Sequence, residues 1–128
     1  MTSDTNPSEL IKEAEGPPGL FCVFEDDGDT GYLYVYQPDE KRILGHLHLY
    51  DRSADLKVAE NDVIVVWSAD KSKCGVVIWG KMRGIIDLAS GREDRVWIDS
   101  RDTPGIGDAE WLAGFPLNSN QSKEQRRG

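Results

Sequence analysis

Two histidines separated by one residue, His46 and His48, have the spacing that could support metal or acid–base chemistry. Alternate side chains of a β-strand point to the same side, roughly 7 Å apart, so both imidazoles could share a metal or exchange protons. A metal site on such a strand also needs a glutamate a few residues later and a third histidine. Asp51 comes too soon, Glu60 comes too late, and the chain has two histidines in all. A small metal- or histidine-dependent enzyme centred on this pair therefore remains an alternative hypothesis.

Four carboxylates crowd five positions in a second cluster, and two glycines accompany them. The acids are Glu25, Asp26, Asp27 and Asp29, and the glycines are Gly28 and Gly31. A calcium loop of the EF type would need glycine at its sixth position and glutamate at its twelfth, where this chain has Thr30 and Tyr36. Asp-Gly and Thr-Gly explain a hairpin turn, but a turn does not need four acids. The surplus negative charge favours a basic partner protein.

Three tyrosines follow the acidic cluster at alternate positions: Tyr32, Tyr34 and Tyr36. On a strand they share one face, where they either pack across strands or contact a protein partner. Stacking on nucleic-acid bases is disfavoured by the neighbouring negative charge. We therefore predict a partner-binding site with no catalytic residues, no bound metal and no cofactor. Its residues are Glu25, Asp26, Asp27, Asp29, Tyr32, Tyr34 and Tyr36.

The net charge of −8 is concentrated in the first half of the chain. Residues 1–60 hold 13 of the 23 acidic residues but five of the 15 basic ones. Such a field repels nucleic acid and anionic membranes and attracts a basic protein, although acidity can also serve solubility alone. Polar residues follow Met1, and no apolar run approaches membrane-spanning length, which predicts a cytoplasmic protein. Cys22 and Cys74 lie in apolar runs typical of core residues.

Most of the chain is predicted to form short strands. They are expected at 20–24, 31–37, 43–50, 63–67, 75–79 and 82–88, with a short edge strand at 95–98. Alternation over 43–50 places Ile43 with Leu47 and Leu49 on one face, and Tyr50 with the histidines on the other. The continuous β-branched run at 63–67 is typical of a strand buried on both faces. Gly84 is expected to mark a bulge.

These elements predict a mainly β, single-domain antiparallel meander, as a curved sheet, small sandwich or open barrel with short helical turns near the termini. Residues 1–19 are expected to be an N-terminal appendage, with a helix capped by Ser8 and ended at Gly16. Residues 20–118 form the all-β domain, in which Asp108 caps a short helix. Residues 119–128 are expected to be a disordered tail.

The residues at 24–32, 43–44, 48–50 and 67–70 resemble a little-characterised family of small bacterial all-β proteins of unknown function, over about residues 20–90. The resemblance implies no catalytic residues. Small acidic cytoplasmic proteins of this general kind often neutralise toxins encoded beside them. The leading hypothesis is therefore an immunity-type inhibitor that occludes a basic toxin domain, and a non-catalytic scaffold module is a further alternative.

Overall fold

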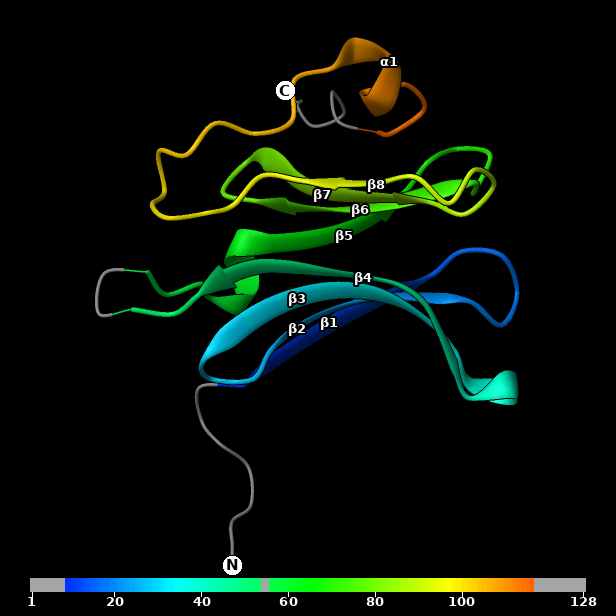
Figure 1. The fold of residues 1–128 in the computed structure, drawn as a ribbon, viewed down its shortest axis with the longest axis horizontal. Helices are drawn as coiled ribbons and strands as arrows, with labels where there is room; N and C mark the ends of the chain where they lie inside the picture. Colours follow the sequence, from blue (N-terminus) through cyan, green and yellow to red (C-terminus); the bar gives the residue numbers. More distant parts are fainter. Residues whose placement is uncertain (1–8, 54–55, 117–128) are drawn as a thin grey trace, which may run out of the picture.

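Two antiparallel four-stranded sheets stack face to face (Figure 1). The computed structural model describes residues 9–53 and 56–116. In each sheet the strands lie in chain order, so every strand pairs with the one that follows it. The sheets are open, and the helical turns are short. The predicted mainly β antiparallel fold is confirmed, in the form of two packed sheets.

The first sheet contains β1 (Leu10–Glu15), β2 (Phe21–Asp26), β3 (Thr30–Gln37) and β4 (Arg42–Asp51), with the 3₁₀ turn η1 (Pro38–Glu40) between the last two. The strands predicted at 20–24, 31–37 and 43–50 are confirmed with small shifts of their ends. The predicted helix between Ser8 and Gly16 is wrong, because β1 occupies its place and pairs with β2. Ser8 and the predicted tail at 119–128 lie outside the described residues.

The physical reason for β1 is the period-two alternation of its side chains. Leu10, Lys12 and Ala14 turn toward the second sheet and are half-buried, whereas the residues between them are exposed. The Lys12 ammonium donates to the carbonyl oxygens of Glu60 (3.2 Å) and Val63 (3.0 Å), which joins the edges of the two sheets.

The second sheet contains β5 (Val63–Trp67), β6 (Lys73–Ile78), β7 (Lys81–Asp87) and β8 (Glu93–Arg95), and the 3₁₀ turn η2 (Glu60–Asp62) precedes it. The hairpin at 63–79 and the strand at 82–88 are confirmed, while the short edge strand lies earlier than predicted. The expectation that β5 is buried on both faces is wrong, since it is an edge strand and its Ile64 is 56% exposed. The strand enclosed on both faces is β6, which runs between β5 and β7.

The outer face of the second sheet is covered by the C-terminal segment and the short helix α1 (Ala109–Leu112), drawn above that sheet in Figure 1. The Asp108 carboxylate accepts hydrogen bonds from the backbone N–H groups of Glu110 and Trp111, which confirms the predicted cap. Trp111 and Phe115 pack with Val77, Met82 and Ile85 of the sheet. No helix among the described residues has the length and apolar character needed to cross a membrane.

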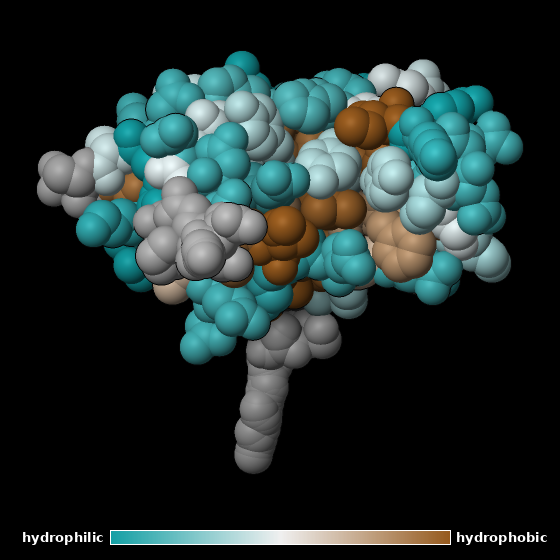
Figure 2. Space-filling model, turned by 90° about the horizontal axis from the view of Figure 1, so that it is seen from below, coloured by the Kyte–Doolittle hydropathy of each residue, from teal (hydrophilic) through white to brown (hydrophobic). Residues whose placement is uncertain are grey.

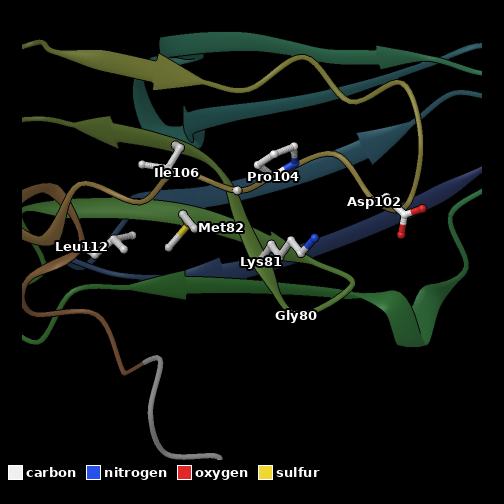
Figure 3. Close-up of a pocket in the computed structure, with 8 residues that line it drawn as sticks. Gly80, Lys81, Met82, Asp102, Pro104, Ile106 and Leu112 are labelled. Atoms are coloured by element: carbon white, nitrogen blue, oxygen red, sulfur yellow. The ribbon is translucent and has the colours of Figure 1, made fainter.

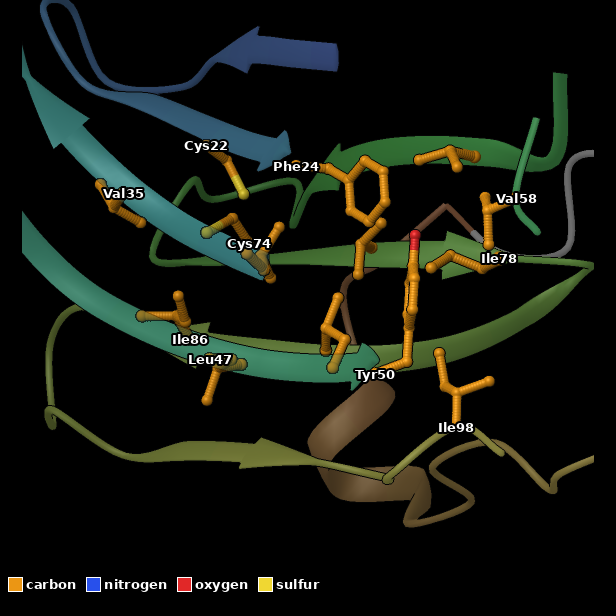
Figure 4. Close-up of a cluster of buried hydrophobic side chains, with 14 of the residues drawn as sticks. Cys22, Phe24, Val35, Leu47, Tyr50, Val58, Cys74, Ile78, Ile86 and Ile98 are labelled. Carbon is orange, nitrogen blue, oxygen red and sulfur yellow. The ribbon is translucent and has the colours of Figure 1, made fainter. Parts of the chain in front are cut away.

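The main core fills the space between the sheets (Figure 4). Its fully buried members from the first sheet include Cys22, Phe24 and Leu33, and from the second Val76 and Ile86. The sheets approach closely at one glycine of β7. A Cβ atom on Gly84 would lie 3.2 Å from a methyl carbon of both Leu47 and Leu49. Glycine at this position therefore lets the two leucines pack directly against the strand.

Two bulges in β4 change which side chains face the core. Leu44 and Gly45 together oppose one residue of β3, so Ile43 pairs with Tyr36 and lies on the outer face. Leu49 is the extra residue of the second bulge, and it lets Tyr50 turn inward, where it is fully buried. The prediction that placed Ile43 on one face with Leu47 and Leu49, and Tyr50 on the other face with the histidines, is therefore wrong. A further register shift in β7 lies at Arg83, beside the Gly84 bulge that we predicted.

Candidate protein-binding surface

The acidic cluster lies at the end of β2 and in the turn to β3, where one carboxylate organises the backbone. The Asp27 side chain accepts hydrogen bonds from the N–H groups of Asp29 and Thr30, each at 2.9 Å. These bonds hold the pKa of Asp27 below its usual value, because they favour the charged carboxylate. The Asp29 side chain is exposed. The turn thus uses Asp27 as a structural cap and leaves Asp29 free to meet a partner.

Asp26 has an internal role in place of the partner contact that we predicted. Its side chain is 1% exposed, and it accepts the Tyr50 hydroxyl at 2.6 Å and the Gly28 N–H at 2.8 Å. Arg52 Nε lies 3.7 Å from the same carboxylate. The Tyr50 ring covers Gly31, where an added Cβ would lie 2.3 Å from the ring. Burial and the Asp26 carboxylate raise the pKa of Tyr50. We therefore no longer assign Asp26 to the partner surface.

The outward-facing side chains of β2, β3 and β4 form a continuous layer that we call the aromatic face. It consists of Phe21, Val23, Tyr32, Tyr34, Tyr36, Ile43, His46 and His48. The Tyr32 ring lies 5.0 Å from the His46 ring and 5.4 Å from the His48 ring, between ring centroids. Figure 2 looks onto this side of the molecule, where hydrophobic patches interrupt the hydrophilic surface. The structure thus gathers the three predicted tyrosines and both histidines on one face.

Trp97 extends the aromatic face at the free edge of β4. Its ring meets the His48 ring edge-on at 5.0 Å, and the guanidinium of Arg95 lies 5.3 Å from the Trp97 ring. The adjacent Ile98 N–H donates to the carbonyl oxygen of Leu49 at 3.0 Å, which fixes this segment against β4. Trp97 was not among the residues that we predicted for the site. Its presence within the predicted edge strand was the signal that could have found it.

This side of the molecule carries most of the large hydrophobic side chains that are exposed in the described chain. Four large hydrophobic side chains are exposed among the described residues. Three of them lie on the aromatic face or beside it: Ile11 of β1 (61% exposed), Ile43 (57%) and Trp97 (41%). Exposed apolar side chains gathered on one face of a protein are typical of interaction sites.

Carboxylates without a basic ion-pair partner among the described residues border the aromatic face, although Glu15 accepts the N–H of Gly19 at 3.0 Å. Glu13 and Glu15 project from β1 on the same side, opposite Val23 and Phe21, and both are exposed. Glu25 accepts the Tyr34 hydroxyl at 2.8 Å, and burial together with this carboxylate raises the pKa of Tyr34 to about 12. Over residues 9–53 and 56–116, the ion pairs are Asp26 with Arg52 and Asp51 with His48. The three glutamates are thus not neutralised by lysines or arginines of the described chain.

The histidine pair gains no further metal ligand from the fold. His48 Nε2 lies 2.8 Å from Asp51 Oδ1, and His46 stacks beside Tyr32 and Tyr34. In the part of the chain that the structure describes, no group of three or more histidine, cysteine, aspartate or glutamate side chains could hold a metal ion. The described residues therefore supply no third ligand for a metal beside the two histidines.

A cavity of about 460 Å³ lies between β7, the loop at 102–106 and α1 (Figure 3). Lys81 and Asp102 lie at one end of it, and Met82, Ile106 and Leu112 lie at the other. Its lining offers two charged side chains of opposite sign but no histidine, cysteine or hydroxyl group to act as a nucleophile. We assign no reaction to this cavity.

The comparisons with known proteins identify a family but no individual relative. The model of a family described as an uncharacterized protein conserved in bacteria (DUF2251) matches residues 8–93. No curated protein and no solved structure matches the chain. The match spans all of the first sheet and reaches the start of β8, so it includes every predicted site residue.

Proposed function

The chain belongs to this uncharacterised bacterial family, and we propose that it is a non-catalytic binding protein that holds a basic protein partner on the aromatic face. The observation that carries the proposal is that exposed apolar side chains share one side of the first sheet with carboxylates that form no ion pair with the described lysines or arginines. Ile43 and Trp97 are exposed within a ring-lined layer, and Glu13 stands at its border.

The surface has the composition of a protein interface. Tyrosine and tryptophan contribute much of the binding energy in protein complexes. The rings of Tyr32, His46 and His48 already contact one another, so binding costs little side-chain entropy. Lysine or arginine of a partner can pair with Glu13 and Glu15 and stack on the exposed Trp97 ring. Complementary charge would also speed the encounter of the two proteins.

The finer form of the proposal is an immunity-type role in the cytoplasm. A toxin domain with a basic active-site surface, such as a nuclease, would be neutralised when the aromatic face covers that surface. The acidity of residues 1–60 supports this choice of partner. The test is to express the protein encoded by the adjacent open reading frame in bacteria, with and without this chain. Growth arrest that this chain relieves would support the immunity role, and arrest that persists would contradict it.

The binding surface itself is tested by substitutions that leave the core untouched. Ile43→Ser and Trp97→Ala should each weaken binding of the adjacent gene product about 30-fold, as for interface anchors. Ile64→Ser is the matched control, because Ile64 is 56% exposed but projects from the second sheet. Equal affinity of all three variants in a biosensor titration would rule out the aromatic face as the binding surface.

The acidic border is tested by association rates. Glu13→Lys should slow association about tenfold at low salt and reduce its salt dependence. Glu110→Lys, an exposed charge reversal in α1 on the opposite side of the molecule, should change the rate much less. Equal rate constants for the two variants would contradict the assignment of the acidic border.

A further inference from the structure

The two cysteines of the chain lie opposite each other in the main core. Cys22 belongs to β2 of the first sheet and Cys74 to β6 of the second, and both are fully buried. Figure 4 shows the two side chains pointing toward one another across the space between the sheets. Cys74 lies near enough to Cys22 to raise the pKa of its thiol. Both cysteines are free in the structure.

Strand alternation explains why the thiols meet. Cys22 lies on the inward side of β2 with Phe24, and Cys74 lies on the inward side of β6 with Val76. Each cysteine is held in register by strands on both sides, since Cys22 pairs with Ala14 and Val35. Face-to-face packing of the two sheets therefore places one thiol against the other.

We propose that Cys22 and Cys74 are a modification site, at which a small disulfide such as glutathione disulfide converts them into an intramolecular disulfide that links the two sheets. One cysteine thiolate attacks a sulfur of glutathione disulfide and releases one glutathione thiolate. The second cysteine thiolate attacks the protein-bound sulfur and releases the other glutathione thiolate. The protein loses two protons and two electrons, and the oxidant gains the two electrons.

Burial sets the rate of this reaction. Desolvation and the neighbouring Cys74 raise the pKa of the Cys22 thiol, which disfavours the reactive thiolate. Glutathione disulfide can reach the pair only when the sheets open transiently. Oxidation of the folded protein should therefore be slow, and low urea should accelerate it. The same enclosure protects the finished disulfide from reductants.

The cross-link should stabilise the fold without altering the aromatic face. It would close a loop of about 50 residues, which restricts the unfolded chain and should raise the melting temperature by about 10 °C. Both sulfurs point into the core, away from the outward-facing Tyr32 and Tyr34. This inference does not depend on the proposed partner.

The test uses the full chain and millimolar glutathione disulfide, with and without low urea. One portion of the protein is then quenched in acid, unfolded and alkylated for measurement of its intact mass. The melting temperature is measured on a second portion that stays folded. We expect loss of both alkylation sites, a peptide linked through Cys22 and Cys74 after digestion, and a higher melting temperature that dithiothreitol reverses. Persistence of two alkylatable thiols in low urea, or the appearance of intermolecular dimers only, would overturn the proposal.

Single-cysteine variants provide a second readout. Cys22→Ala and Cys74→Ala each leave one thiol, so under the same conditions they should end as mixed disulfides with glutathione and show no thermal stabilisation. Stabilisation of either variant by the oxidant would also contradict the cross-link. The peptide map of the unaltered protein keeps the test decisive if a variant fails to fold.

Discussion

Removal of the Tyr50 hydroxyl tests whether Asp26 is a structural residue. In Tyr50→Phe, the carboxylate loses the donor that lies 2.6 Å from its Oδ2 atom, while the Gly28 N–H remains on Oδ1. Arg52 Nε, at 3.7 Å, is too distant to replace the lost hydrogen bond. A hydrogen bond to a charged group contributes about 1.5–3 kcal/mol, and a buried carboxylate has no water to substitute for it. We therefore expect the free energy of unfolding to fall by about 2 kcal/mol.

Urea denaturation followed by tryptophan fluorescence measures this loss, and Tyr34→Phe is the matched control. That variant also removes a tyrosine hydroxyl that donates to a carboxylate, at 2.8 Å, but the Tyr34–Glu25 pair is half-buried on the outer face. Water can hydrate Glu25 after the substitution, so the loss should stay near 0.5 kcal/mol. A Tyr50→Phe variant as stable as Tyr34→Phe, with an unchanged urea dependence, would refute the structural role of Asp26.

Three further predictions concern pH and packing. The free energy of unfolding should fall as pH rises from about 10 to about 12. The folded state keeps Tyr34 protonated up to a pKa of about 12, whereas the unfolded state releases this proton near pH 10. Tyr34→Phe should therefore flatten this part of a plot of the urea midpoint against pH. Hydrogen bonds from the N–H and hydroxyl of Ser72 lower the pKa of Asp70 to about 2. The contribution of the charged Asp70 to the free energy of unfolding should therefore be lost as pH falls from about 4 to 2. In Asp70→Asn, stability should depend less steeply on pH in this range. Trp111→Ala should destabilise the protein by about 3–5 kcal/mol in urea denaturation, since it uncovers the second sheet, yet leave binding at the aromatic face unchanged.

The sequence predicts most strands because their apolar alternation is regular. For example, the apolar run at 63–67 and the polar turn after it are sufficient to predict the β5–β6 hairpin. The segment at 10–15 is short, and a helix and a strand both suit it. Its period-two alternation is too short to decide between the two, and its strand form depends on pairing with β2.

The candidate site could be predicted only in part, because it depends on contacts between strands. The position of the acidic turn follows from its Asp and Gly residues, but the burial of Asp26 depends on Tyr50, which is 24 positions away. The bulge at Leu49 turns Tyr50 inward, and simple alternation over 43–50 assigns it to the opposite face. The other bulge carries Ile43 outward. The two β-bulges of β4 thus bury Tyr50 and expose Ile43.

The two outer sheet faces differ in a way that favours the first sheet as the proposed binding surface. Val77, Met82 and Ile85 on the outer face of the second sheet are covered by α1 and the segment that leads to it. The first sheet carries a comparable layer of rings and aliphatic groups, but no described segment crosses it, and Ile43 remains 57% exposed. The covering segment lies beyond residue 93, where the family match ends, whereas the strands of the aromatic face lie within it. Exposed apolar surface costs free energy in water, so among the described residues the uncovered face of the first sheet is the better candidate for the binding that we propose.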